Sequence, residues 1–335
     1  MTRPADHPAI PPPNVGVLIV NLGTPNAPEP GAVRLYLKEF LSDPRVVEIP
    51  QLVWQPILRG VILRTRPKKS AHAYRQVWTD EGSPLAAITA RQAKALEGAF
   101  GPRVIVDHAM RYGRPAIRER IDALKAAGCE RILIAPLYPQ YCGATTATAN
   151  DEAFAHLRRL RWQPAVRTLP PYYDDPLYIA ALQARMEEGL AALDFAPDAI
   201  LASFHGMPQR TLELGDPYHC HCRKTARLLA EASGRALLVT FQSRFGRAKW
   251  LEPATDTTLA ALPGQGLKKV AILAPGFSAD CLETLEELAI RGRETFLAAG
   301  GTDFAYLPCL NDSPAGMEML RSIIGRELEG WAAPT

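Results

Sequence analysis

Short apolar runs alternate with longer amphipathic stretches from one end of the chain to the other. The runs are rich in β-branched residues and read as strands at VGVLIVNL (15–22), RVIVDHAM (103–110), RILIAPLY (131–138), AILASF (199–204), ALLVTF (236–241), KVAILAP (269–275) and FAYLPCL (304–310). Helical patterns fill the intervals, most clearly at 83–100 and 178–193. This alternation predicts an α/β fold in which helices cover both faces of parallel sheets.

A Pro-rich segment, LPPYYDDP at 169–176, divides the chain near its middle. With 335 residues the chain is long enough for two domains of ordinary size. We therefore expect two doubly wound domains of the Rossmann or flavodoxin type. The expected organisation is a flexible N-terminus over 1–14, domains over 15–168 and 169–310, and a C-terminal helix over 311–335.

Composition excludes several classes of protein. Hydrophobic residues make up 47% of the chain and charged residues 22%, which is typical of a folded globular protein. The net charge is +3 without a dense Lys/Arg block, so nucleic acid is not an expected partner. The sequence has no apolar run of membrane-spanning length and no signal-peptide pattern at its start, which predicts a cytoplasmic protein. The absence of a nucleophile elbow, a GxGxxG motif and a P-loop disfavours esterases, dinucleotide enzymes and NTPases.

An unusual set of polar and aromatic residues follows the predicted strands. In open parallel sheets, ligands bind beyond the carboxyl ends of the strands. We therefore expect one large cleft between the domains. Its expected residues are Asn21, Arg111, Tyr112, Tyr138, Tyr141, His205, Gln242, Ser243, Arg244, Phe277 and Asp280. His205 ends the run AILASF and is followed by Gly-Met-Pro, and a neutral imidazole there can accept a proton or bind a metal.

The segment GFSADCLETLEELAIRGRE (276–294) carries a series of acidic residues. A helix that starts near Ser278 or Asp280 would place Asp280, Glu283, Glu287 and Glu294 along one face. One interpretation is a solvated helix face with acids near its N-terminus. The other is a carboxylate track that delivers a divalent cation to His205, since histidine with carboxylates suits Fe²⁺ or Zn²⁺. The residues alone leave both interpretations open.

Two further segments allow alternative interpretations. The loop GDPYHCHCRKT (215–225) supplies Cys220 and Cys222, which with Cys142 and Cys309 would complete the four thiolates of a 2Fe–2S cluster; the alternative is ordinary thiols. The segment 48–69 has apolar residues at 53, 54, 57, 58, 61 and 62 and a basic end. It is either a core helix or an apolar lip for a flat lipophilic substrate, with basic residues for lipid headgroups.

The motifs VLIVNLGTP, FLSDPRV, YRQVWTDEGSPL, MRYGRP, LYPQY, SFHGMP, TFQSRFGRAKWLEPATD and PGFSADCLETLEEL occur in order between about residues 16 and 312. Together they resemble the ferrochelatase family, whose members insert Fe²⁺ into a porphyrin, and the ADCLETLEE stretch resembles its bacterial branch. The resemblance implies two doubly wound domains around a porphyrin cleft. It also implies a lyase of haem biosynthesis that converts protoporphyrin IX and Fe²⁺ into protohaem with release of two protons.

The resemblance also implies roles for individual residues. His205 corresponds to the family's essential histidine and Glu283 to its metal-site glutamate; Asp280 and Glu287 would form the delivery track. Implied porphyrin-binding positions are Leu22, Tyr74, Ser83, Arg111, Tyr112, Tyr138 and Trp250. Some relatives bind a 2Fe–2S cluster through cysteines, which here would be Cys142, Cys220, Cys222 and Cys309.

We also expect a monomer or homodimer that makes peripheral contact with the inner face of the membrane through 48–69. The alternatives to a protoporphyrin ferrochelatase are a related chelatase that uses coproporphyrin or cobalt, and a non-enzymatic carrier of haem or metal.

Overall fold

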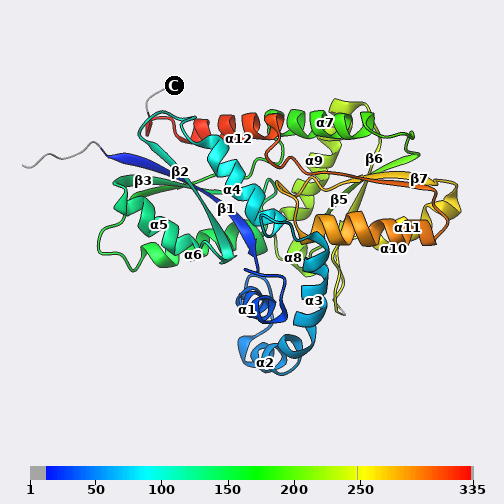
Figure 1. The fold of residues 1–335 in the computed structure, drawn as a ribbon, viewed down its shortest axis with the longest axis horizontal. Helices are drawn as coiled ribbons and strands as arrows, with labels where there is room; N and C mark the ends of the chain where they lie inside the picture. Colours follow the sequence, from blue (N-terminus) through cyan, green and yellow to red (C-terminus); the bar gives the residue numbers. More distant parts are fainter. Residues whose placement is uncertain (1–12, 247, 333–335) are drawn as a thin grey trace, which may run out of the picture.

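Two four-stranded sheets, each with all strands parallel, form the framework of the molecule (Figure 1). The computed structural model describes residues 13–246 and 248–332. Residues 1–12 of the expected flexible N-terminus and the last three residues of the chain lie outside the described ranges. The α/β fold with two parallel sheets, predicted from the alternation of strands and helices, is confirmed.

The two sheets have the same strand order. The first sheet runs β2-β1-β3-β4 and the second β6-β5-β7-β8. In each half the first strand lies inside the sheet, the second strand pairs with it at one edge, and the third and fourth strands follow on its other side. The strands are β1 (Asn14–Thr24), β2 (Val104–Gly113), β3 (Cys129–Pro136), β4 (Ala165–Thr168), β5 (Ala199–His205), β6 (Leu237–Gln242), β7 (Lys269–Leu273) and β8 (Asp303–Leu307). This order is that of doubly wound flavodoxin-like sheets.

Helices cover the faces of both sheets. In the first half they are α1 (Pro30–Leu41), α2 (Gln51–Ile57), the π-helical η1 (Leu58–Ile62), α3 (Leu63–Val77), α4 (Pro84–Leu96), α5 (Ile117–Ala126), the π-helical η2 (Gly143–Ala147) and α6 (Thr148–Leu157). In the second half they are α7 (Pro176–Ala191), α8 (Gln209–Glu213), α9 (Tyr218–Ser233), α10 (Thr255–Ala261), the 3₁₀ turn η3 (Pro263–Gln265), the π-helical η4 (Glu283–Gly292), α11 (Arg293–Ala298) and α12 (Pro314–Glu327). Helices α1, α2 and α3 project from one side of the two sheets (Figure 1).

A large hydrophobic cluster contains residues of both halves and joins them. Side chains alternate along each strand, so Val17 and Ile19 of β1 face this cluster while Leu18 and Val20 face the helices on the other side of the sheet. The same cluster contains residues of α4, α7, α12, β5 and β7. Figure 1 shows α7 and α12 along one side of both sheets, and they also contact each other. The relative position of the sheets therefore depends on packing that both share.

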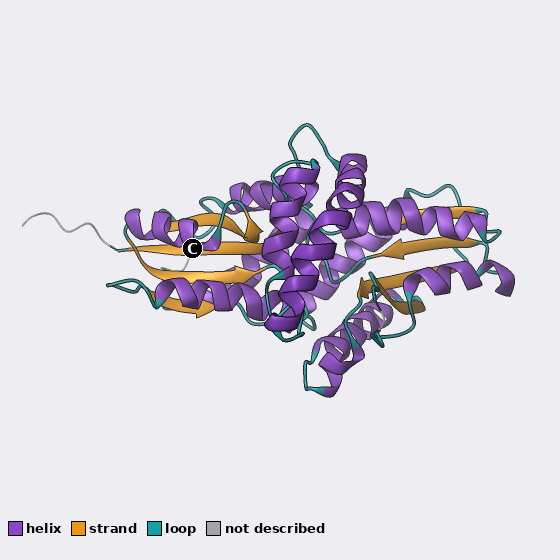
Figure 2. Ribbon diagram, turned by 90° about the horizontal axis from the view of Figure 1, so that it is seen from below, coloured by secondary structure: helices purple, strands orange, loops and turns teal. Residues whose placement is uncertain are grey.

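The carboxyl ends of both sheets point toward the centre of the molecule. In Figure 2 the strand arrows of each sheet end near the helices between them. Each sheet has a topological switch point, between β1 and β3 in the first and between β5 and β7 in the second, and such points are where doubly wound sheets bind ligands. The fold thus brings the segments that follow β1, β3, β5 and β7 toward one central region.

The structure differs from the sequence prediction at three places. The sequence prediction missed β4, a short edge strand whose four residues, AVRT, show too little apolar pattern to be recognised. The strand predicted over 304–310 ends at Leu307. The prediction of a loop over 215–225 is wrong from Tyr218 onward, because helix α9 begins at that residue. The Asp216 carboxylate accepts the first backbone N–H of the helix at 3.0 Å.

A buried ion pair fastens the end of α1 to the end of β2. The Asp43 carboxylate accepts hydrogen bonds from Arg111 (2.6 Å), the Tyr112 hydroxyl (2.9 Å) and the Thr148 hydroxyl (2.5 Å). Burial alone would raise the pKa of Asp43, but the bonds from Thr148, the Arg45 backbone N–H and Tyr112, together with the charge of Arg111, hold it below its usual value. Tyr112 is fully buried (0% exposed), so it supports this region from behind and presents no surface to a ligand.

We expect Asp43→Asn to lower the free energy of unfolding by about 3 kcal/mol at neutral pH, because it leaves the buried Arg111 with only the more distant Glu152 carboxylate, 3.8 Å away. The folded-state pKa of Asp43 is depressed. Its stabilising effect is therefore complete above the unfolded-state pKa of about 4 and is lost as the pH falls through the folded-state value. Urea unfolding at a series of pH values measures this loss.

Asp151→Asn is the matched control, because Asp151 pairs with Arg45 at an exposed site, where ion pairs contribute about 0–1 kcal/mol. A difference between the wild type and Asp43→Asn that stays constant from neutral to strongly acidic pH would contradict this account.

Candidate active site

His205 is the last residue of β5 and lies beside Gln242, the last residue of β6. The next residue, Gly206, donates its backbone N–H to the carbonyl of Gln242 at 2.7 Å. A Cβ atom at Gly206 would lie 2.4 Å from that carbonyl oxygen, so only glycine permits this junction. The Nδ1 atom of His205 lies 2.7 Å from the Gly206 carbonyl oxygen. Since a carbonyl only accepts, Nδ1 carries the proton and Nε2 of the neutral ring keeps its lone pair.

The acidic segment forms a π-helix, η4, that begins at Glu283 and is preceded by Leu282. The prediction of one carboxylate face from Asp280 to Glu294 is therefore wrong in extent. Asp280 precedes the helix, and Glu294 is an exposed residue of α11. The π-helical turn is wider than the α-helical turn on which the predicted spacing rested. Glu283 and Glu287 both remain on this helix.

Asp280 is a buried structural residue in this structure, with 5% of its surface exposed. Its carboxylate accepts hydrogen bonds from Tyr306 (2.5 Å), Asn311 (2.7 Å) and Thr284 (3.0 Å). These bonds fasten the start of η4 to the end of β8 and the segment after it. A carboxylate engaged in this way is not available as part of a delivery track, so we assign Asp280 to the support of the helix.

Ser243, which directly follows the strand partner of His205, fixes Glu287. The backbone N–H and the hydroxyl of Ser243 donate to its two carboxylate oxygens at 2.8 and 2.5 Å. Burial raises the pKa of Glu287 above its usual value, while the Ser243 hydrogen bonds and the positive charges of protonated His205 and of Arg291 lower it. The site therefore holds a partly desolvated carboxyl group whose proton affinity depends on the protonation of His205.

Leu282, directly before Glu283, packs against the first-half cluster that contains Tyr36 and Tyr74. Burial, as the main cause, and the negative charge of Glu283 raise the pKa values of Tyr36, Tyr74 and Tyr138. The Tyr138 hydroxyl accepts the backbone N–H of Leu22 at 2.6 Å, which joins the ends of β1 and β3 at the first switch point. Glu283 thus lies between the two switch points of the molecule.

The other predicted porphyrin-binding residues form two groups. Ser83 and Tyr74 are buried beside the end of β1, where the Thr24 hydroxyl donates to Ser83 at 2.8 Å. Trp250 packs beside Gly206, and its indole N–H donates to the Phe245 carbonyl at 3.1 Å. Arg66 of α3 lies over the ring of Phe245 at 5.1 Å, so helix α3 also contacts this second group. Arg111 and Tyr112 instead hydrogen-bond to Asp43, and the Tyr112 ring is buried in the same hydrophobic cluster as Tyr74.

The four cysteines predicted as cluster ligands lie in separate environments. Cys142 and Cys222 share one apolar cluster, Cys309 lies in another beside Asp280 and Tyr306, and Cys220 is exposed. Burial raises the pKa of Cys142 to about 12 and also raises that of Cys222, which opposes the thiolate form that metals bind. The residues therefore do not fit a cluster held by these four thiols. Within residues 13–246 and 248–332, no group of three or more His, Cys, Asp or Glu side chains is placed to hold a metal ion.

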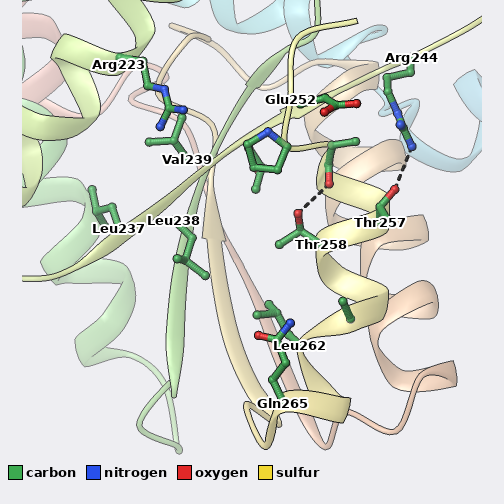
Figure 3. Close-up of a pocket in the computed structure, with 14 residues that line it drawn as sticks. Arg223, Leu237, Leu238, Val239, Arg244, Glu252, Thr257, Thr258, Leu262 and Gln265 are labelled. Atoms are coloured by element: carbon green, nitrogen blue, oxygen red, sulfur yellow. Dashed lines mark hydrogen bonds between the residues drawn. The ribbon is translucent and has the colours of Figure 1, made fainter. Parts of the chain in front are cut away.

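A large cavity lies away from these residues, at the outer edge of the second sheet (Figure 3). Its volume is about 670 Å³, and it lies between β6 and α10 with Arg223, Arg244 and Glu252 among its lining residues. None of the predicted catalytic or porphyrin-binding residues lines it. Its lining also includes none of the described buried side-chain atoms that lack a hydrogen-bond partner. The candidate active site is therefore defined by its side chains and its position at the switch points.

Sequence analysis missed Tyr36 and Asp43 as residues of this region. Tyr36 lies on α1 and donates to the carbonyl of Gly23, near the end of β1, at 3.2 Å. Asp43 follows α1 within the FLSDPRV segment, where an acid after an apolar helix was the one available signal. Both are distant in sequence from the strand ends they support, and the sequence pattern does not reveal this pairing.

Comparisons with known proteins agree on one family. The family model described as ferrochelatase matches residues 14–328. The chain is 53% identical to the ferrochelatase of Agrobacterium fabrum, with 98% of this chain and 97% of that protein covered. It is 54% identical to the ferrochelatase of Rhizobium meliloti, with 99% and 100% covered.

Solved structures share the fold at low sequence identity. SirB from Bacillus subtilis with Fe³⁺ matches with a TM-score of 0.57 at 13% identity, covering 95% of this chain and 98% of that chain. CbiX, described as the terminal enzyme for biosynthesis of sirohaem in denitrifying bacteria, matches with a TM-score of 0.51 at 16% identity, covering 93% and 98%. The family match over nearly the whole sequence and the close relatives agree with the two-sheet fold: the chain belongs to the ferrochelatase family.

Proposed function

We propose that this chain inserts Fe²⁺ into protoporphyrin IX to form protohaem, with His205 and Glu283 as the central residues. The observation that carries the proposal is the placement of His205 at the end of β5, at the second switch point, where its strand partner Gln242 bonds to the start of the acidic helix η4. Both substrates need the chemistry that this arrangement offers. The porphyrin must lose two inner protons, and the metal must lose water.

His205 acts as the proton acceptor. Its Nδ1 atom is committed to the Gly206 carbonyl, so Nε2 is the atom that receives a proton from a pyrrole nitrogen. A correctly placed general base contributes about 10²–10⁴-fold to a rate. Gly206 keeps this atom in place because the strand can turn there only without a side chain.

Glu283 and Glu287 act on the metal substrate. Carboxylate oxygens replace water on Fe²⁺, and their negative charge attracts the divalent cation to this side of the site. Glu287 is oriented by Ser243, which directly follows the strand partner of His205, so it passes the metal toward the imidazole. The proposed delivery track therefore consists of Glu287 and Glu283. Asp280 holds the start of η4 in place.

Leu22, Tyr138 and Trp250 form the walls that hold the porphyrin. Leu22 and Tyr138 are joined by a hydrogen bond at the first switch point, and Trp250 packs beside Gly206 at the second. Such rigid walls can hold the ring out of plane, with strain of about 1–5 kcal/mol supplied by binding elsewhere on the substrate. Tyr74 and Ser83 support the first wall, and Arg111 and Tyr112 hold the end of β2 behind it. The proposal gives Cys142, Cys220, Cys222 and Cys309 no step in the reaction.

An anaerobic metallation assay tests the proposal directly. Wild-type protein with Fe²⁺ and protoporphyrin IX should give the absorbance spectrum of protohaem with multiple turnovers. Parallel reactions with Co²⁺ and with coproporphyrin separate this activity from that of a related chelatase. Binding of haem without turnover would instead identify a carrier and would refute the proposed function.

We expect His205→Ala to abolish metallation and Glu283→Gln to lower the rate strongly, while porphyrin affinity changes little in either variant. His205→Ala removes the base, and a neutral amide at residue 283 neither attracts the metal nor loses a proton. Steady-state metallation and fluorescence titration with protoporphyrin measure the two effects separately. Wild-type turnover in folded His205→Ala would remove His205 from the mechanism, and a collapse of porphyrin binding in Glu283→Gln would reassign Glu283 to substrate positioning.

We also propose that the lip, residues 48–69, contacts a membrane surface. Helix α2 and the π-helical η1 expose Val53, Ile57 and Val61 at four-residue spacing, while Trp54 and Leu58 face the core. Leu52 is 93% exposed. The basic residues Arg59, Arg64, Lys68 and Lys69 are exposed around this apolar surface. Exposed apolar side chains beside basic ones favour an anionic lipid surface, and both porphyrin and haem are lipophilic. No helix in the described part of the chain is long and apolar enough to span a bilayer.

We expect the double variant Arg64→Glu plus Lys68→Glu to lose most of its flotation with anionic liposomes, because each basic residue near such a surface contributes about 1 kcal/mol. Arg158→Glu plus Arg159→Glu makes the same change in net charge at exposed residues after α6 and should float like the wild type. Equal flotation of all three proteins would refute contact through the lip.

A further inference from the structure

The side chain of Gln242 connects the two elements that carry His205 and Glu283. It is 3% exposed and lies at the end of β6, opposite His205. Its Nε2 atom donates to the backbone carbonyl of Glu283 at 2.9 Å. Its Oε1 atom accepts the hydroxyl hydrogen of Ser203, on β5, at 2.9 Å. One buried amide therefore joins the strand of the proposed base to the first residue of the acidic helix.

The backbone of Gln242 adds a third connection. Its carbonyl accepts the N–H of Gly206, directly after His205, at 2.7 Å. The residue thus contacts the chain on both sides of His205, through Ser203 and Gly206, as well as the start of η4. A buried polar group with a missing partner costs about 1–3 kcal/mol, so the structure resists any shift of η4 that would break these bonds.

The start of η4 has few other restraints on this side. π-Helical turns are rare and occur in short pieces, often at functional sites, so their position depends on tertiary contacts. Asp280 fastens the helix toward β8, at the opposite edge of the second sheet from β6. Ser243 binds the side chain of Glu287 and not the helix backbone. Among the hydrogen bonds of the described residues, those of the Gln242 side chain connect the backbone of Glu283 to strand β5.

We propose that Gln242 is a positioning residue for metallation, one that sets the separation of His205 and Glu283 without contacting either substrate. This inference rests on the proposed roles of those two residues. It implies that the hydrogen-bond donor of Gln242 matters for reaction with the metal and not for porphyrin binding. Loss of this donor lets the start of η4 move away from His205.

The test compares Gln242→Met with Thr240→Val. Gln242→Met keeps the length of the side chain and removes both hydrogen bonds. Thr240→Val is the control for loss of a buried hydrogen bond on β6, because Thr240 accepts from Thr255, which among the described hydrogen bonds is linked to Gln242 only through Ser203. This variant leaves the bond from Gln242 to the Glu283 carbonyl in place. We expect Gln242→Met to lower kcat by about 10-fold or more with an unchanged KM for porphyrin, and Thr240→Val to remain within about two-fold of the wild type.

A second measurement does not depend on turnover. Calorimetric titration with Zn²⁺, a redox-stable probe, should show about 10-fold weaker binding for Gln242→Met than for the wild type or Thr240→Val. Gln242→Asn keeps a neutral amide but is one methylene too short to reach the Glu283 carbonyl, and it should weaken Zn²⁺ binding similarly if Gln242→Met does not fold.

The outcomes separate the two proposals. Absence of metallation in the wild type would refute the proposed function, while the Zn²⁺ titration would still decide the role of Gln242. Zn²⁺ affinity and kcat of the Gln242 variants equal to those of Thr240→Val would overturn the positioning role.

Discussion

The hydrophobic cluster that both sheets share holds their carboxyl ends against each other, and the candidate site exists because of it. Helices α7 and α12 contribute to this cluster together with strands of both sheets, so neither half buries its apolar surface alone. Each sheet then contributes its own switch point, with Leu22 and Tyr138 from the first and His205 from the second. A shift of one sheet against the other would separate residues that act on the same substrate. Packing far from the chemistry therefore controls the geometry of the site.

Three acids near η4 show how environment distinguishes side chains of similar chemistry. Asp280 accepts three side-chain hydrogen bonds and is structural. Glu287 is oriented by Ser243, directly after the strand partner of His205. Glu283 faces tyrosines of the first half, and the described bond to Gln242 involves its backbone carbonyl. The same division applies to the first half, where Asp43 neutralises Arg111 in the interior while the tyrosines remain near the site.

The sequence predicted the fold well because strand and helix periodicities are local signals. The α/β class, seven of the strands and the position of His205 at a strand end follow from short windows of residues.

Edge strand β4 was missed because four residues carry little pattern. The prediction of one carboxylate face from Asp280 to Glu294 was wrong because no local signal distinguishes a π-helix from an α-helix. The prediction of a loop over 215–225 was wrong because its cysteines and histidines suggested a ligand site, whereas Asp216 accepts the first N–H of a helix there. The fastening roles of Gln242, Asp280 and Asp43 were beyond sequence reasoning, since each depends on partners brought together only by the tertiary fold.

The central claim is that His205 and Glu283 act as one unit on the metal and the porphyrin. A double-mutant cycle in single-turnover metallation tests this most directly, using the wild type, His205→Ala, Glu283→Gln and the double variant. Residues that act as a unit have strongly non-additive effects. The account predicts that the double variant is about as slow as the slower single variant. Rate losses that multiply in the double variant would show that the two residues act independently and would contradict the account.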